Sequence, residues 1–252
     1  MDIELALLRA IGRCLPPLPH ATAVINRVLK PVYLRKPRVA VVTTAWGIRM
    51  RLNPAEAVDG GILFYPQLYN RTEFRWLRSL IRPGDRFADV GAYLGAYSLM
   101  AAQLGARVTA IEANPEAYAV LTQNIRMNSF AIEAIHCGAS DRAEELSLTV
   151  QRSQNMGGSS FLVASDAAIR VPCRPLVELV PRADVMKIDI EGMEFKVLRP
   201  YLANSHRPRA IILEAPQETE ALQLCLSLGY AIQGRTQENV LLTDLSKTGQ
   251  DA

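Results

Sequence analysis

Several targeting and binding signals are absent from this 252-residue sequence. Its first residues, Met-Asp-Ile-Glu, are acidic where a secretory signal peptide is basic, and its longest uncharged stretch, residues 90–106, is too short to span a membrane. Lysine and arginine are spread along the chain, give a net charge of only +3 and form no basic run of the kind that binds nucleic acid. We therefore expect a cytoplasmic protein with no transmembrane segment and no nucleic-acid partner.

Cysteine and histidine are scarce, at four and three residues. The cysteines, at positions 14, 137, 173 and 225, form neither a CxxC pair nor a Cys/His cluster, so we expect reduced thiols. No group of histidine, aspartate and glutamate has the spacing of a metal site, and we predict no metal. Apolar residues, at 49% of the chain, are numerous enough for a sizeable core. The sequence leaves the oligomeric state open, including a homo-oligomer.

The N-terminal part of the chain differs in pattern from the rest. Residues 1–15 carry apolar side chains at helical spacing and end at a proline cluster, and residues 39–52 have β-branched residues on both sides of a short turn. These patterns predict an N-terminal helix and a β-hairpin, in an extension that covers residues 1–58. Residues 59–252 are predicted to form the main domain.

From residue 86 onward, short apolar runs alternate with helical stretches, which predicts an α/β fold with a parallel sheet and helices on both faces. The expected strands are residues 86–90, 107–112, 132–137, 185–190 and 210–214. The expected helices are residues 96–104, 115–128, 193–202 and 218–228. An inserted hairpin with an added strand is expected from residues 146–150, 159–163 and 169–173, and a closing antiparallel hairpin from residues 230–233 and 239–243.

The turn after the first of these strands carries an acidic residue and two glycines, Asp89, Gly91 and Gly95. Such a turn lets a ligand approach the backbone and meet the unpaired N–H groups of the next helix. It differs from a nicotinamide fingerprint, because Tyr93 stands where that motif has its second glycine and would crowd a pyrophosphate. A cofactor with an amino-acid end, a sulfonium and an adenosine fits better, since Asp89 can bind its ammonium.

Glu112 ends the next strand, 23 residues after Asp89, close to the spacing at which an acidic side chain meets ribose hydroxyls. The alternative is that Gly91 and Gly95 only form a tight turn and that Glu112 favours the N-terminus of the following helix.

Over roughly residues 59–243, the sequence resembles the FkbM family of class I methyltransferases. The matching blocks are RPGD at 82–85, DVGA at 89–92, EANP at 112–115, GASD at 138–141, GGSS at 157–160, KIDIEG at 187–192 and ENVL at 238–241. KIDIEG is the most specific of them. Two positions depart from the family pattern, which usually has asparagine in place of Tyr93 and often an acidic residue in place of Asn70.

The resemblance implies a Rossmann-like sheet of seven strands, S-adenosyl-L-methionine as cofactor, and O-methylation of a hydroxyl on a sugar, glycolipid or secondary metabolite. By position in the family's motifs, it implies that Glu112 takes the ribose. It also implies that Asp89, Gly91 and Tyr93 line the methionine end and that residues 139–141, namely Ala139, Ser140 and Asp141, flank the adenine. Three further residues are expected in the cofactor site: Gly95, Ser98 and Ala113.

Asp189 and Glu191 of the KIDIEG block follow the fourth strand, at the edge where open α/β sheets bind ligands. Methyl transfer needs an aligned acceptor, and a hydroxyl acceptor also loses a proton, so a carboxylate or imidazole within reach would help as general base. We expect Asp189 to be that base. His136, late in a predicted strand, is the alternative and fits a structural role equally well. Asp189 could instead cap the following helix, with Glu191 and Glu194 at its positive end and Lys187 paired with one of them.

Residues 58–74 and 153–165 are expected to be loops that select the acceptor. The glycine pair within 153–160 would let that segment close over the acceptor, or would only form a hairpin turn. Two other functions stay open at this point. One is a catalytically idle binding or assembly protein that retains the fold, and the other is a nicotinamide oxidoreductase, which Tyr93 disfavours.

Overall fold

The computed structural model describes residues 3–14, 27, 30–34, 39–65, 69–150, 159–162, 168–203 and 206–247. The described residues fall in two compact units that divide between Arg71 and Thr72. The boundary between residues 58 and 59, which is predicted to separate an N-terminal extension from the main domain, stays a prediction. No helix in the described part of the chain combines the length and the apolar character needed to cross a bilayer.

The first unit contains the predicted N-terminal helix and the predicted hairpin. Its elements are α1 (Ile3–Cys14), α3 (Lys30–Tyr33), β1 (Ala40–Thr43), β2 (Arg49–Leu52) and α4 (Ala57–Phe64). Strands β1 and β2 pair antiparallel, and the hydroxyl of Thr44 accepts hydrogen bonds from the N–H groups of Trp46 and Ile48 in the turn between them. Both predicted elements are therefore confirmed.

The second unit is built on a sheet of seven strands in the order β11-β12-β10-β9-β3-β4-β5. The strands are β3 (Arg86–Val90), β4 (Arg107–Glu112), β5 (Ile132–His136), β9 (Val185–Ile188), β10 (Ala210–Glu214), β11 (Tyr230–Arg235) and β12 (Asn239–Asp244). Strands β3, β4, β5, β9 and β10 are parallel to their neighbours in that group, and β12 runs antiparallel to both β10 and β11. The predicted seven-stranded Rossmann-like sheet is confirmed.

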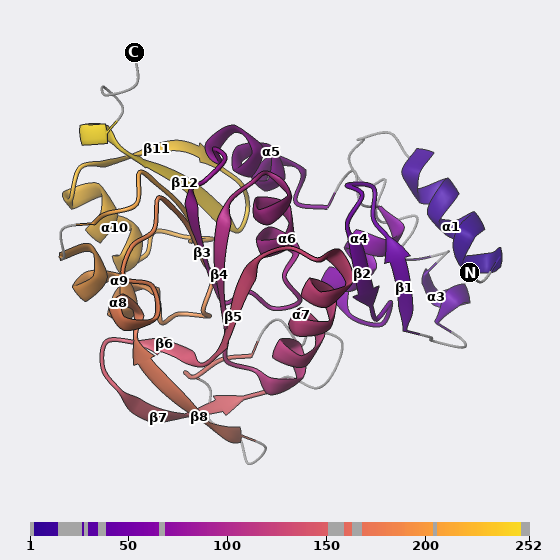
Figure 1. Ribbon diagram of the computed structural model, residues 1–252, viewed down its shortest axis with the longest axis horizontal. Coiled ribbons are helices and arrows are strands. Elements are labelled where there is room, and N and C mark those ends of the chain that lie inside the picture. The colour runs from indigo at the N-terminus through magenta and orange to yellow at the C-terminus, as the bar shows by residue number, and fades with distance from the viewer. Residues whose placement is uncertain are drawn as a thin grey trace. The chain divides into compact units, whose positions relative to one another are not determined.

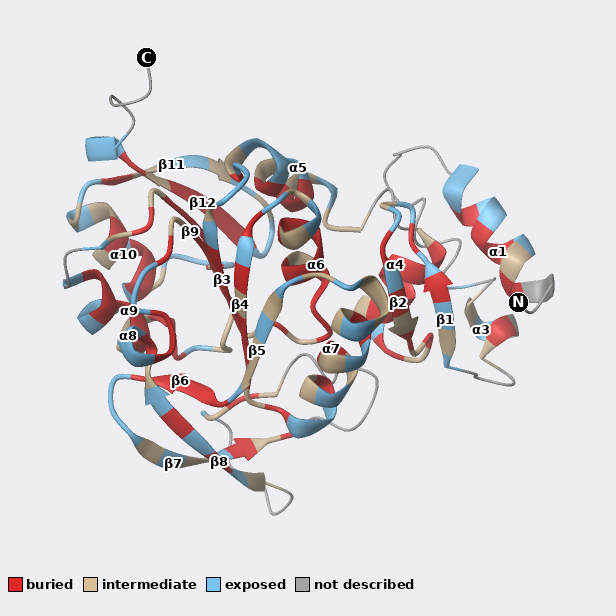
Figure 2. Ribbon diagram, viewed as in Figure 1, coloured by how far each residue is buried: buried red, intermediate tan, exposed pale blue. Residues whose placement is uncertain are grey.

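Helices cover both faces of this sheet, as predicted (Figure 1). On one face lie α5 (Arg71–Leu80), α6 (Ala96–Gln103) and α7 (Pro115–Asn128), and on the other lie α8 (Leu176–Leu179), α9 (Glu194–Ala203) and α10 (Glu220–Ser227). The central strands are buried along their length (Figure 2), because a parallel sheet with both faces covered has no solvent side. Helix α10 begins at Glu220 and not at residue 218, because the Thr219 hydroxyl accepts the N–H of Leu222 and caps the helix.

The inserted segment forms a separate three-stranded sheet, in the order β6-β8-β7. Strands β7 (Glu144–Thr149) and β8 (Ala168–Pro175) make the expected antiparallel pair, and β6 (Gly138–Ser140), which was not predicted, pairs parallel with β8. The strand predicted at 159–163 is wrong over the described residues 159–162, where only one bridge, between Ser160 and Thr149, is formed. Residue 163 lies outside the described residues.

The interpretation of residues 58–74 as a loop is also wrong, because α4 and α5 occupy most of them. Two adjacent glycines, Gly60 and Gly61, disguise α4 in the sequence, since glycine is a poor helix former. A side chain at position 61 would collide with the ring of Tyr69, whose Cδ2 lies 2.5 Å from the Cβ position. Gly61 therefore serves packing and does not indicate a loop.

One backbone contact couples the turn after β3 to the turn after β9. A Cβ atom on Gly91 would lie 1.8 Å from the carbonyl oxygen of Asp189, and Gly91 has a left-handed φ of +83°. The N–H of Asp189 also donates to the carbonyl of Val90, at 3.0 Å. Only glycine meets both conditions at position 91, so the first glycine of the cofactor motif is required by the KIDIEG segment.

We expect Gly91→Ala to destabilise the protein more than Gly84→Ala. Gly84 has a similar φ of +88° but no atom within 4 Å of its Cβ position, so it isolates the conformational penalty of about 1–2 kcal/mol. At Gly91 the overpacking adds to that penalty and should bring the loss to about 3 kcal/mol or more. Urea denaturation of both variants measures the difference, and equal losses would contradict the contact.

Candidate functional site

The candidate site lies where the carboxyl ends of β3, β4 and β9 meet. Strand β3 has β4 on one side and β9 on the other, and the chain passes from β5 at the edge of the sheet to β9 on the far side of β3. The strand order reverses at this point, which is where open α/β sheets bind ligands. Each of the three strand ends carries an acidic residue: Asp89, Glu112 and Asp189.

Glu112 holds the turns after β3 and β4 together. Its side chain is only 8% exposed, and its two carboxylate oxygens accept the N–H groups of Tyr93 and Asn114, each at 2.7 Å. Burial raises the pKa of Glu112 to about 7, although these N–H groups oppose the rise. Each oxygen keeps a further lone pair, so the carboxylate can still accept hydroxyl groups such as those of a ribose.

Tyr93 contributes its backbone N–H to this arrangement. Its φ is +50°, in the left-handed region that asparagine tolerates better than other non-glycine residues. The backbone conformation thus gives a physical reason for the asparagine that the FkbM pattern usually has here. Since the N–H to Glu112 is retained, the change to tyrosine leaves that contact of the turn intact.

Asp89 and Ser98 form a buried pair beneath the start of α6. Asp89 is 1% exposed, and the Ser98 hydroxyl donates to its carboxylate at 2.5 Å. Burial raises the pKa of Asp89 to about 6, against the lowering effects of Ser98 and Lys187. Asp89 therefore fixes the beginning of α6 as well as contributing negative charge to the site.

The start of α6 is suited to an anionic group. Gly95 precedes the helix with a φ of +88° and supplies no side-chain cap, and its missing Cβ makes room for Leu121 of α7. The first N–H groups of an α-helix carry partial positive charge and bind carboxylates. Together with the carboxylates of Asp89 and Glu112, this donor set matches a ligand that has a carboxylate, an ammonium and ribose hydroxyls, as S-adenosylmethionine has.

The residues expected at the adenine lie in and beside β6. Ala139 and Ser140 are buried, and the Ser140 hydroxyl donates to Glu144 at 2.6 Å. Lys196 of α9 pairs with Glu144 at 2.7 Å and with Asp141 at 3.4 Å. Hydrogen bonds from Lys196 and Ser140 lower the pKa of Glu144 to about 2. The polar groups of this segment are thus held in a network of their own.

Asp189 stands directly after β9 and is paired with Lys187. The Lys187 ammonium lies 2.7 Å from the Asp189 carboxylate and 5.4 Å from the ring centre of Tyr97. The Lys187 side chain is 3% exposed and that of Asp189 is 37% exposed. Burial alone would raise the pKa of Asp189, but Lys187 and a hydrogen bond with Glu214 outweigh it, so the pKa lies below its ordinary value. Asp189 is therefore an ionised carboxylate that can reach a ligand.

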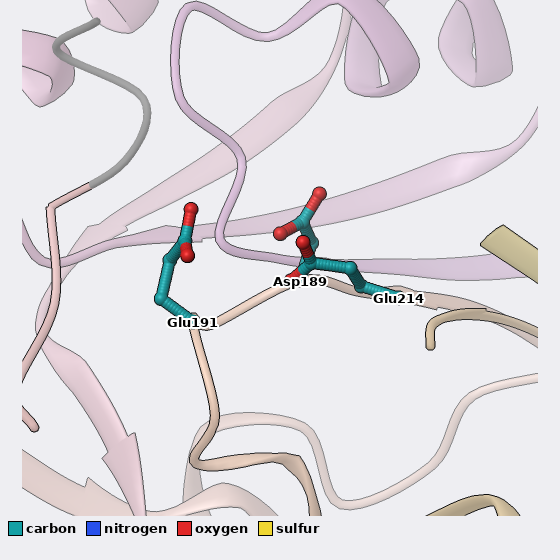
Figure 3. Close-up of side chains that lie close together, drawn as sticks. All are labelled: Asp189, Glu191 and Glu214. Atoms are coloured by element: carbon teal, nitrogen blue, oxygen red, sulfur yellow. The ribbon is translucent and has the colours of Figure 1, made fainter. Parts of the chain in front are cut away.

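Glu214, at the end of β10, completes this group and was missed by the sequence analysis. Carboxylate oxygens of Asp189, Glu191 and Glu214 lie within 4.8 Å of one another (Figure 3). The rule applied to Glu112, an acidic residue ending a parallel strand, would have identified Glu214. The spacing would suit a divalent cation, but Lys187 already supplies positive charge to Asp189, and we interpret the group as carboxyls that share a proton. The absence of a metal stays a prediction.

The turn after Asp189 is held by Glu194, the first residue of α9. Glu191 and Gly192 have left-handed φ values of +53° and +98°. The Glu194 carboxylate accepts the N–H groups of Ile190 and Gly192, at 2.9 and 3.2 Å. Glu194 thus stabilises the turn between β9 and α9, and Asp189 is directed to Lys187.

Two residues at the end of the segment 153–160, Ser159 and Ser160, contact both the end of β4 and the turn after β9. The Asn114 amide donates to the Ser159 hydroxyl at 3.2 Å, and the Ser160 hydroxyl donates to the carbonyl of Glu191 at 3.2 Å. Residues 159 and 160 therefore connect the end of β4 with the turn after β9. The rest of the predicted closing loop, residues 153–158, lies outside the described residues.

His136 lies away from the acceptor-side carboxylates. Its ring stacks on Tyr118 with centres 4.9 Å apart, and its Nε2 lies 3.2 Å from the carbonyl oxygen of Ala113. It ends β5, three strand spacings from β9, which corresponds to roughly 14 Å. The two candidate bases are therefore not brought together.

We expect Asp189→Leu to destabilise the protein strongly and Asp189→Asn to do so only slightly. Leucine would leave the Lys187 ammonium buried without its carboxylate partner, which costs about 3 kcal/mol. The asparagine oxygen can still accept a hydrogen bond from Lys187. Urea denaturation of both variants tests this order, and a loss as large for asparagine as for leucine would show that charge, and not the hydrogen bond, is what Lys187 requires.

Solved structures with a similar arrangement have low sequence identity to this chain. A precorrin-6Y C5,15-methyltransferase of Geobacter metallireducens is 14% identical, with a TM-score of 0.46 over 71% of this chain and 87% of that chain. A tRNA (uracil-54, C5)-methyltransferase of Pyrococcus abyssi, in complex with S-adenosyl-L-homocysteine, is 14% identical, with a TM-score of 0.47. The alignment covers 78% of this chain and only 41% of the P. abyssi enzyme.

The family is shown by the sequence itself. No curated protein sequence matches the chain. The family model of the methyltransferase FkbM domain, however, matches residues 89–232, which are more than half of the chain and include Asp89, Glu112, Asp189 and Glu214. The chain therefore belongs to the FkbM family of S-adenosylmethionine-dependent methyltransferases.

Proposed function

We propose that this methyltransferase transfers a methyl group to a hydroxyl of a small molecule, namely a sugar, a glycolipid or a secondary metabolite. The observation that carries the proposal is the position of Asp189. Its carboxylate is ionised and partly exposed, and its own backbone carbonyl contacts Gly91. The acceptor side of the site therefore directly adjoins the cofactor side. No nucleic-acid partner and a cytoplasmic location remain predictions.

On the cofactor side, we assign the ribose hydroxyls to Glu112 and the ammonium to the negative charge of Asp89. The carboxylate end is assigned to the start of α6, which follows Gly95. Ala113, Ala139, Ser140 and Asp141 are assigned to the adenine. These roles are supported by the burial and the hydrogen bonding of the carboxylates and by their places at adjacent strand ends.

When bound, S-adenosylmethionine supplies a methyl group on a positively charged sulfur. On the acceptor side, Asp189 accepts the proton of the acceptor hydroxyl as the oxygen forms its bond to the methyl carbon. The cofactor would leave as neutral S-adenosylhomocysteine, which would keep the electron pair of the broken carbon–sulfur bond, so charge and atoms balance. Lys187 keeps Asp189 ionised before the reaction. We assign the base to Asp189 and not to His136, whose ring is packed on Tyr118.

Glu112→Ala should weaken S-adenosylmethionine binding by roughly 10- to 100-fold, the loss expected for hydrogen bonds to a charged group. Wild-type affinity should also fall as the pH drops from 8 to 6, because the raised pKa of Glu112, about 7, means that its accepting carboxylate becomes protonated over this range. Isothermal titration calorimetry measures both effects. Glu133→Ala, which removes an exposed glutamate from β5, is the matched control.

If Glu112→Ala and Asp89→Ala both stay folded and bind S-adenosylmethionine as tightly as the wild type, the cofactor assignment is wrong.

Asp189→Asn should lower kcat by about 10²- to 10⁴-fold, the usual contribution of a general base, with little change in the affinity for S-adenosylmethionine. The measurement is the rate of S-adenosylhomocysteine formation with a confirmed acceptor. Full activity of this variant would remove the base role from Asp189.

The acceptor class is tested by incubation of the protein with methyl-labelled S-adenosylmethionine and fractionated small molecules from the source cells. A labelled product with a new methyl ether supports the proposal. Label on a nitrogen or carbon, or on nucleic acid, would contradict it. No S-adenosylhomocysteine with any fraction would favour a binding protein that retains the methyltransferase fold.

A further inference from the structure

Glu214 and Asp189 occupy equivalent places at the ends of two neighbouring strands. Strands β9 and β10 pair in parallel with Ile188 opposite Leu213, so the next residue along the first strand is Asp189 and along the second Glu214. Their carboxyl groups lie close together beside that of Glu191, with oxygens of all three residues within 4.8 Å of one another (Figure 3). Two carboxyl groups this close repel each other when both are ionised, which favours a proton on one of them.

The charges around this pair decide which carboxyl keeps the proton. Lys187 lies 2.7 Å from Asp189 and favours the ionised form of that residue. Glu214 faces Asp189 and Glu191, and Lys187 is the cation that acts on it. Burial, the hydrogen bond with Asp189 and these negative charges raise the pKa of Glu214 to about 9.

Among the described residues, the further charged groups that act on this cluster are acidic. Glu191 itself is influenced by the negative charges of Glu194 and Glu238. On the far side of β10, the residue opposite Glu214 is Asn239, which is neutral. At neutral pH, Glu214 is therefore a carboxylic acid and Asp189 a carboxylate.

We propose that Glu214 is a positioning residue of the methyl-transfer reaction, which donates a hydrogen bond as a neutral acid to the Asp189 carboxylate and, opposite Lys187, fixes its orientation toward the acceptor. The role of Asp189 as base rests on the proposed function, whereas the shared proton does not. Above pH 9, Glu214 ionises and repels Asp189, so the orientation and the methyl transfer that depends on it are lost.

The shared proton is tested without an acceptor, by infrared spectroscopy of protein that carries ¹³C-labelled glutamate. We expect a protonated glutamate signal at pH 8, lost as the pH rises past 9. At pH 8 Glu112, with a pKa of about 7, is mostly ionised and contributes little to this signal, and the Glu214→Gln variant identifies the part that belongs to Glu214. Glu214→Gln should abolish it and Glu133→Ala should keep it. No such signal in the wild type, or its persistence in Glu214→Gln, would overturn the proposal.

The positioning role is tested with two substitutions of Glu214. The amide of Glu214→Gln can still donate to Asp189 but cannot titrate, whereas Glu214→Met removes the donor. With a confirmed acceptor, Glu214→Met should lower kcat about tenfold or more, the loss expected for one hydrogen bond to a charged group, at unchanged affinity for S-adenosylmethionine. Glu214→Gln should lose much less and should lack the wild-type fall in kcat near pH 9.

Equal losses in both variants, or an alkaline fall that persists in Glu214→Gln, would overturn the positioning role. If the wild type methylates no acceptor, the proposed function fails, and the infrared result still decides whether Glu214 shares its proton with Asp189.

Discussion

The backbone contact between Gly91 and Asp189 is the constraint on which the rest of the site depends. It brings the turn after β3, with its buried Asp89 and the uncapped start of α6, against the turn after β9. The carboxylates assigned to cofactor and acceptor stand at separate strand ends, and this contact holds the two turns against each other. In-line transfer requires the reacting atoms to be held a few ångströms apart, so a direct contact between the two turns provides the necessary proximity.

Around this contact, four neighbouring strand ends each carry one carboxyl group, and their surroundings give them different properties. Burial raises the pKa of Asp89 and Glu112 to about 6 and 7, and the pKa of Glu214 to about 9. Only the pKa of Asp189 lies below its ordinary value, because the ammonium of Lys187 favours its ionised form. Similar side chains at equivalent places in the sheet are thus differentiated by one buried ammonium and by the hydrogen bonds that each carboxyl makes.

Much of the fold was predictable, because strand and helix periodicity is local. The helix at 115–128 and the strands at 86–90, 107–112 and 210–214 agree with the structure in both type and extent. Helix α4 was not predictable, since Gly60 and Gly61 break the helical pattern for the sake of a contact with Tyr69. The short β6 was missed because its three residues pair with β8, more than 30 residues away.

The sequence by itself determined the family, the seven-stranded sheet and the acidic residues at three strand ends, because these follow from motifs and from alternation along the chain. Only the tertiary structure decided that Asp189 pairs with Lys187, that Glu194 holds the turn before α9, and that Glu214 joins Asp189 and Glu191. The physical reason is that neighbouring parallel strands are connected through helices. Side chains that share a proton, such as those of Asp189 and Glu214, are therefore adjacent in the sheet but far apart in the chain.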